Sequence, residues 1–342
     1  MRPSQVHFSL YMISRRTIRI KVMQTLYALE AGREHETEKP KQEERAQTVD
    51  TFVDLAENQK KGKAILTSKF DQSRDAFAYV MYLMFETARY AERDSHLRAG
   101  KNLPTQEDLS VNTKIAGNTL MWQTLEHPEF NAVIKNMHAE ARVPLELIKK
   151  MYQQLAATDE YAEYIQAPSR NNKSEKAILE FILNHIILPG EASTAHLEET
   201  FIHWDDDAEQ IQILITNYLN RPPSTHFKDI LGDEKRDFAF RLLQTVPEKQ
   251  DYLLEIIKPK LNNWDADRIA ALDMILLQMG IAEFLFFETI PTKVTINEYI
   301  DLAKSYSTPQ SGQFVNGLLD NIQKELTLQK KIQKVIYKNS TL

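Results

Sequence analysis

Three arginines near the start of the chain form the pattern with the clearest chemistry. Arg15, Arg16 and Arg19 lie at i, i+1 and i+4, so on a helix at least two guanidinium groups project from one side. A guanidinium presents its N–H donors in a fixed fork that can pair with two phosphate oxygens at once. The spacing alone favours a plainer interpretation, which is a solvated arginine face or ion pairs to acidic residues elsewhere in the chain.

The element that must position these arginines is a helix over residues 15–29. Its apolar residues recur at the spacing of one helical face, at Ile18, Val22, Leu26 and Leu29. Ser14 is suited to the N-cap position. We therefore expect a helix that buries an aliphatic face and shows an arginine face.

The charge of the chain is distributed unevenly. The 342 residues are enough for two or three helical subdomains, and their net charge is −6. Residues 1–29 contain five basic residues and no acid, so this segment carries +5 and the remainder carries −11. A small basic surface on an acidic body predicts selective binding of a short polyanion.

Several kinds of site are not expected. The chain has no cysteine, which excludes disulfides and cysteine nucleophiles and fits a cytoplasmic location. No phosphate-binding loop or hydrolase motif occurs, and His196 and His203 have no third metal ligand near them. We therefore expect no catalytic site, no metal and no cofactor. No membrane span is expected either, because the best apolar run, residues 276–287, is interrupted by Glu283.

Helical spacing recurs along the rest of the chain. A buried helix is expected over residues 70–93, after a charged stretch at 31–63 that is read as a solvated helix or a connection. Further helices are expected at 105–221, 237–246 and 250–261. Clusters of aspartate follow two tryptophans and are expected to cap helices, at Trp204 and Trp264.

The C-terminal third has the most informative pattern. Residues Thr295 to Glu298 fit a capping box, which predicts a helix that begins there and ends at Tyr306. Residues 307–312 are expected to form a loop before a helix at 314–326. The Asn316-Gly317 pair suggests a hairpin by local rules, but no alternating strands flank it, so we expect the helix to continue.

Two separated groups of residues resemble the NusB family. The first group is Arg15-Arg16-Thr17-Ile18-Arg19 with Gln24-Thr25-Leu26-Tyr27. The second runs from Arg268 through Leu272, Ile290-Pro291-Thr292-Lys293-Val294, Ile296-Asn297-Glu298, Leu302-Ala303-Lys304 and Phe314-Val315-Asn316-Gly317-Leu318-Leu319-Asp320. The resemblance covers residues 12–30 and 230–325, and family members are far shorter. It implies an all-α, NusB-like helical bundle of two subdomains, enlarged by a helical insertion.

The resemblance also suggests how the chain is divided. Residues 1–11 are interpreted as a disordered extension, with Met12 as a second possible start. The arginine helix, a connection and a core helix are assigned to 12–100. A helical insertion of unknown role is assigned to 101–225, the C-terminal bundle to 226–326, and a basic tail to 327–342.

The family resemblance implies a function in transcription. NusB proteins bind the boxA RNA of ribosomal RNA operons with NusE, a small-subunit ribosomal protein, in the RNA polymerase antitermination complex. It implies RNA contacts by six residues, namely Arg15, Arg16, Arg19, Lys293, Lys304 and Phe314. Tyr27 is assigned to the NusE face or to ordinary half-burial. The plainer interpretations are solvated lysines and a core phenylalanine, and Gln313 stands where the family has a basic residue.

Two other functions fit parts of the sequence. A NusB-like domain also precedes certain ribosomal RNA cytosine methyltransferases, but those enzymes need a cysteine nucleophile and an α/β cofactor domain, and this chain has neither. A protein-interaction scaffold without RNA binding is the second alternative, because the insertion is large and acidic.

Overall fold

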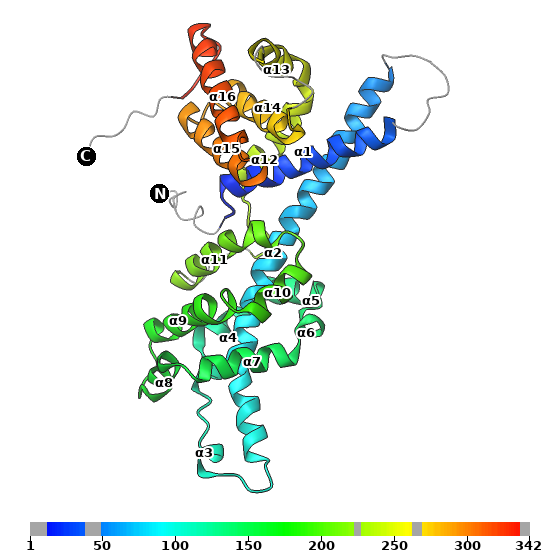
Figure 1. The fold of residues 1–342 in the computed structure, drawn as a ribbon. Helices are drawn as coiled ribbons and strands as arrows, with labels where there is room; N and C mark the ends of the chain where they lie inside the picture. The colour runs from blue at the N-terminus through cyan, green and yellow to red at the C-terminus, as the bar shows by residue number, and fades with distance from the viewer. Residues whose placement is uncertain (1–11, 38–48, 222–226, 262–268, 336–342) are drawn as a thin grey trace, which may run out of the picture. The chain divides into compact units, whose positions relative to one another are not determined.

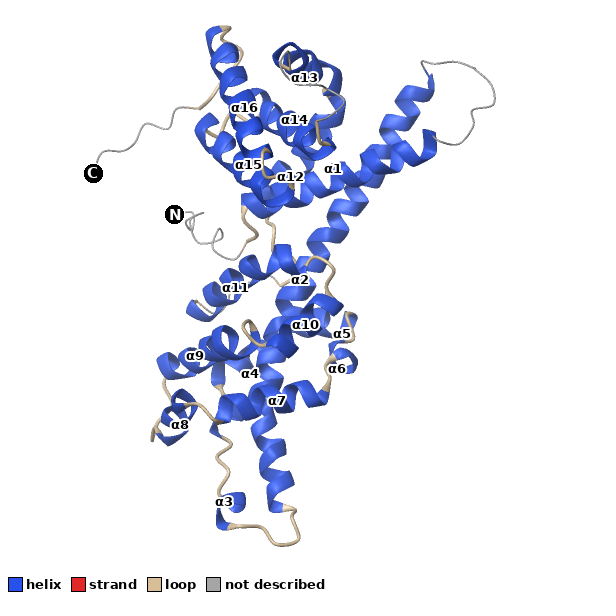
Figure 2. Ribbon diagram, in the orientation of Figure 1, coloured by secondary structure: helices blue, strands red, loops and turns tan. Residues whose placement is uncertain are grey.

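The chain folds into helices. The computed structural model describes residues 12–37, 49–221, 227–261 and 269–335. Every regular element in these ranges is a helix, and no strand occurs in them, which confirms the all-α prediction (Figure 2). The chain divides into two compact units, a terminal unit (Arg15–Lys69 and Asp233–Leu342) and a middle unit (Met1–Ser14 and Phe70–Gly232). In the described part, no helix is long and apolar enough to cross a membrane.

The terminal unit is organised around one buried helix. Its elements are α1 (Arg15–Thr37), the first part of α2 (Val49–Ala99), α12 (Asp233–Glu248), α13 (Gln250–Ile257), η5 (Lys258–Lys260), α14 (Ala271–Phe286), α15 (Thr292–Tyr306) and α16 (Ser311–Leu328) (Figure 1). Helix α14 contacts α1, α12, α13, α15 and α16. It is apolar on nearly all sides, as a central helix must be. A Cβ on Gly280 would meet the Leu319 side chain at 3.0 Å, so glycine permits the close packing of α14 and α16.

The middle unit contains the second part of α2 and the helices that follow it. They are α3 (Gln106–Leu109), η3 (Lys114–Gly117), α4 (Thr119–Leu125), α5 (Pro128–Asn136), α6 (Ala139–Arg142), α7 (Leu145–Ala156), α8 (Asp159–Gln166), α9 (Asn172–Phe181), η4 (Ile182–Ile187), α10 (Glu191–Thr200) and α11 (Trp204–Asn220). Aromatic rings fill its core. Phe227 packs against Phe77, Phe130 and Tyr218 with ring centroids 5.9, 5.2 and 5.3 Å away.

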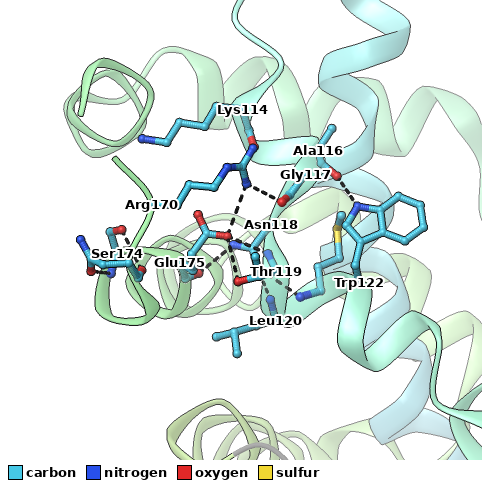
Figure 3. A network of polar contacts seen from close by, with 12 residues as sticks. Lys114, Ala116, Gly117, Asn118, Thr119, Leu120, Trp122, Arg170, Ser174 and Glu175 are labelled. Carbon is cyan, nitrogen blue, oxygen red and sulfur yellow. Dashed lines mark hydrogen bonds and ion pairs between the residues drawn. The ribbon is translucent and has the colours of Figure 1, made fainter. Parts of the chain in front are cut away.

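A buried carboxylate joins several segments of the middle unit (Figure 3). Glu175 on α9 is 1% exposed and accepts hydrogen bonds from the Thr119 backbone and the Tyr164 hydroxyl, both at 2.7 Å. The Arg170 guanidinium lies 3.6 Å from this carboxylate. The side chain of Asn118 donates to the Glu175 carbonyl at 2.8 Å while it caps α4. This network ties the start of α4 to α8 and α9.

Some helix boundaries differ from the sequence-based expectations. The capping box is wrong, because α15 begins at Thr292 after the extended Pro291, and Thr295 lies inside the helix. Helix α16 begins at Ser311, three residues before the expected start at 314, and it continues through Gly317 as expected. Helix 70–93 is part of the longer α2, and α2 begins within the charged stretch at 31–63.

The tryptophan–aspartate prediction is corrected in detail. Asp205, Asp206 and Asp207 lie in the first turn of α11, where they favour the positive end of the helix dipole. The N-cap itself is His203. The Trp264 cluster, the extension at 1–11 and the tail from 336 lie outside the described residues.

Candidate nucleic-acid interface

Helix α1 divides its arginines between the core and the surface. Ile18 and Val22 are fully buried, as the spacing predicts. The Arg19 side chain is only 2% exposed, whereas those of Arg15 and Arg16 are 33% and 41% exposed. The exposed arginine face therefore consists of Arg15 and Arg16 and does not include Arg19.

Arg19 belongs to a buried polar hub. Its Nε and Nη2 donate to Glu283 Oε1 at 2.7 Å and Oε2 at 3.0 Å. Glu283 on α14 is fully buried, and it also accepts from the hydroxyls of Thr295 at 3.0 Å and Tyr299 at 2.8 Å. Burial and the Glu283 carboxylate raise the pKa of Tyr299 well above its usual range, so its hydroxyl stays protonated and can donate.

This geometry argues against a direct RNA contact by Arg19, so we correct that prediction. If the guanidinium left this ion pair to contact RNA, the buried carboxylate would remain charged in an apolar environment without its partner, which is unfavourable. Arg19 instead anchors α1 to α14 and α15. The sequence carried a signal for this role in Glu283, the charge that interrupts the apolar run of α14, but it did not indicate which cation would meet it.

Arg15 lies where α1 meets α12. Its guanidinium is ion-paired with Glu234 and lies 5.6 Å from the centroid of the Phe238 ring. Burial, and then the nearby Arg15, lower the pKa of Lys235 on α12. Lys235 is thus a neighbouring cation that sequence reasoning missed, and the charged start of α12 was its only signal.

Arg16 and Lys304 lie on either side of one carboxylate. Asp301 Oδ2 is 3.8 Å from the Arg16 guanidinium, and its Oδ1 is 3.8 Å from the Lys304 ammonium. A Cβ on Gly312 would lie 2.7 Å from Lys304 Cγ, so the lysine stem covers this glycine at the start of α16. The acid Asp301 therefore holds an α1 cation and an α15 cation near the start of α16.

Lys293 and Lys304 share a face of α15. Both are exposed, and their spacing of eleven positions brings the helix back to the same side, about 16 Å further along the axis. We call Arg16, Lys293, Asp301 and Lys304 the Arg16–Lys304 surface. The ion pairs within it are long and exposed, and such pairs contribute only about 0–1 kcal/mol, so a phosphate can displace Asp301 readily.

The two aromatic candidates differ in accessibility. Phe314 is 8% exposed and lies on the buried side of α16, which supports its interpretation as a core residue and argues against base stacking. Tyr27 is 49% exposed on α1, so it is available to a partner. Which partner it contacts stays a prediction.

The fold and surface define a helical protein that displays a few cations on one bundle. The NusB family profile matches residues 198–324. The NusB transcription antitermination protein of Salinibacter ruber is 41% identical over 131 residues, which are 38% of this chain and 76% of that protein. Its counterpart in Listeria monocytogenes serotype 4a is 37% identical over 98 residues, 29% of this chain and 77% of the relative. No solved structure matched.

The chain therefore belongs to the NusB family, whose members are transcription antitermination proteins and not enzymes. This confirms the family resemblance and the NusB-like bundle enlarged by further helices. The family profile begins within α10, so α1 to α9 lie outside it, and with them Arg16 and Arg19.

Proposed function

We propose that this protein binds boxA-type RNA of ribosomal RNA operons together with NusE, within the RNA polymerase antitermination complex. Membership of the NusB family supports the role in antitermination. The single observation that carries the RNA-binding part is the Arg16–Lys304 surface, where exposed cations from two helices form only long ion pairs, with Asp301 and, for Arg16, also with Glu298. Transcription of ribosomal RNA operons would place the protein in the cytoplasm.

Each residue of the surface has a distinct part in this proposal. Arg16 and Lys304 contact adjacent phosphates after Asp301 is displaced, and Lys293 extends the contact along α15. Arg15 adds a further phosphate contact beside α12 once its ion pair with Glu234 is broken. Tyr27 contributes to the NusE surface. Arg19 positions α1 and does not touch RNA.

The second candidate function is a protein-interaction scaffold without RNA binding. The charge of the middle unit favours this function for that unit. Residues 70–232 contain 24 Asp and Glu but 15 Lys and Arg, a net charge of −9. An acidic surface repels a nucleic-acid backbone. The middle unit is thus better suited to a protein partner than to RNA.

Binding measurements with the full chain test the proposal. A boxA RNA and a scrambled RNA of equal length are titrated by fluorescence anisotropy, with and without NusE. We expect NusE to increase the affinity for boxA more than the affinity for the scrambled RNA. Equal affinities in all four titrations, or no complex with NusE, would contradict the proposed function and leave the scaffold.

A further inference from the structure

The terminal unit contains a cavity that the Arg16–Lys304 surface does not use. Its volume is about 240 Å³, and it is partly open to solvent. Side chains of five helices line it, namely α1, α2, α12, α13 and α14, and they include Leu26, Leu243 and Ile275, each less than a tenth exposed. Gly62 of α2 also lines the cavity.

One polar side chain is more deeply buried than the others that line this cavity. Gln278 on α14 lines the cavity and is 5% exposed. Among the residues that the structure describes, none forms a hydrogen bond with its side-chain amide. The amide is not among the fully enclosed polar atoms without a partner, so it opens into the cavity, where water or a ligand can bond it.

Two of the neighbouring amides are already occupied. Gln244 and Gln59 also line the cavity, and their amide nitrogens donate to Glu248 at 2.7 and 2.9 Å. Asn58 and Gln250 line it as well, but both are partly exposed, so Gln278 is the buried amide of the wall. An amide offers one donor edge and one acceptor edge side by side.

We propose that this cavity binds a nucleobase, with adenine as the best match, whose adjacent donor and acceptor pair with the Gln278 amide. Size permits this, because apolar cavities of about 150 Å³ already admit benzene. The chemistry permits it too, because Gln pairs through two hydrogen bonds with the N6 donor and N7 acceptor of adenine. Leu26, Leu243 and Ile275 can pack on the faces of the ring, as apolar side chains do in most small-molecule sites.

The nucleobase has two possible sources, an unstacked base of bound RNA or a free nucleoside. Only the first rests on the proposed function. Proteins commonly recognise single-stranded RNA by taking an unstacked base into such a slot. Competition distinguishes the two sources, because saturating adenosine weakens RNA binding only if the RNA base occupies the cavity.

The decisive probes are adenosine and 6-methylpurine riboside, which differ by replacement of the N6 amino donor with a methyl group. Titration of the full chain by NMR or calorimetry is expected to show adenosine binding at least about tenfold more tightly, because the amide would otherwise keep an unpaired acceptor. Equal affinities, or no adenosine binding at millimolar concentration, would overturn the proposal. Neither result depends on whether boxA RNA binds.

Matched variants locate the site. Gln278→Met keeps the length of the side chain but removes the amide, so the preference for adenosine is expected to disappear. Gln244→Met removes an amide that is already occupied, so the preference is expected to remain. Arg16→Ala is expected to weaken RNA binding while adenosine still binds. If Gln278→Met fails to fold, the comparison of the two nucleosides on the unaltered chain still decides the proposal.

Discussion

Each unit of the molecule contains a buried glutamate that joins several helices, and the two glutamates are held differently. Glu283 in the terminal unit and Glu175 in the middle unit each accept a hydrogen bond from a tyrosine hydroxyl and face an arginine. The arginine of Glu283 is 2% exposed at 2.7 Å, whereas Arg170 is 38% exposed and 3.6 Å from Glu175.

The difference shows what a buried ion pair can add to a fold. Around Glu175 the uncharged donors already satisfy the carboxylate, so Arg170 can remain at the surface and bond the backbone of Lys114 and Gly117. Around Glu283 the charge of Arg19 is part of the core, and it fixes the orientation of α1. Glu298 lies 3.5 Å from Arg19 and 3.9 Å from Arg16, so the hub continues to the exposed cation.

The largest effect is expected from Arg19→Met. Removing one partner of a buried ion pair leaves Glu283 uncompensated and should lower the free energy of unfolding by about 3–5 kcal/mol. Urea unfolding followed by circular dichroism measures this. Arg170→Met is the matched control and should cost about 1 kcal/mol or less, because Arg170 is exposed and uncharged donors already bond the Glu175 carboxylate. Similar losses of stability for both variants would show that the ion pairs of Glu283 and Glu175 contribute equally.

A smaller loss is expected from Glu175→Ala. The Thr119 backbone and the Tyr164 hydroxyl would lose their acceptor, at a cost of about 1–3 kcal/mol. Hydrogen exchange should show the loss in α4, α8 and α9, with the terminal unit unaffected. Equal loss of protection in both units would contradict the expectation that Glu175 stabilises the middle unit alone.

Asp301→Asn should change RNA binding more than stability. The substitution removes the acid between Arg16 and Lys304, so boxA RNA should bind about 2–5 times more tightly, equivalent to less than about 1 kcal/mol. Fluorescence anisotropy measures the affinity. Asp320→Asn on α16, whose carboxylate pairs with Lys324 and not with Arg16 or Lys304, is the control and should leave it unchanged. Weaker binding by Asp301→Asn would indicate that the acid itself contacts RNA.

The smallest effect concerns pH. Lys334 donates to the carbonyls of Glu283 and Phe287 at 2.8 and 2.7 Å, and burial lowers its pKa to about 8. Between pH 8 and the ordinary lysine pKa the unfolded chain binds more protons, so stability should rise with pH in that window. The side chain is half-exposed, so we expect no more than about 0.5 kcal/mol. A thermal unfolding series with Lys334→Met as reference should show the rise only in the unaltered chain.

Much of the fold could be predicted from the sequence because helical spacing is a local signal. The faces of α1 and α16 followed from residues three and four apart, such as Ile18 with Val22 and Leu318 with Ile322. The start of α15 could not be predicted in this way. Thr295 looks like a cap locally, but its hydroxyl bonds Glu283, which lies on another helix.

The candidate site shows the same limit. Arg16 and Arg19 are equivalent in type and near each other in spacing, so the sequence assigned both to RNA. Which of the two arginines is buried depends on a long-range contact, because Glu283 is 264 residues from Arg19 in the chain. Gln278 could not be identified as a binding group either, because its lack of a partner is visible only once the helices around it are packed.

The central claim is that Arg16 faces RNA while Arg19 holds the fold, and the salt dependence of boxA binding tests it most directly. The plot of log affinity against log salt concentration is measured for the unaltered chain, Arg16→Ala and Arg19→Lys, each with NusE and each checked for folding. We expect Arg16→Ala to flatten the slope by about 0.7, the value for one lost phosphate contact, while folded Arg19→Lys keeps it. An unchanged slope for Arg16→Ala would contradict the account.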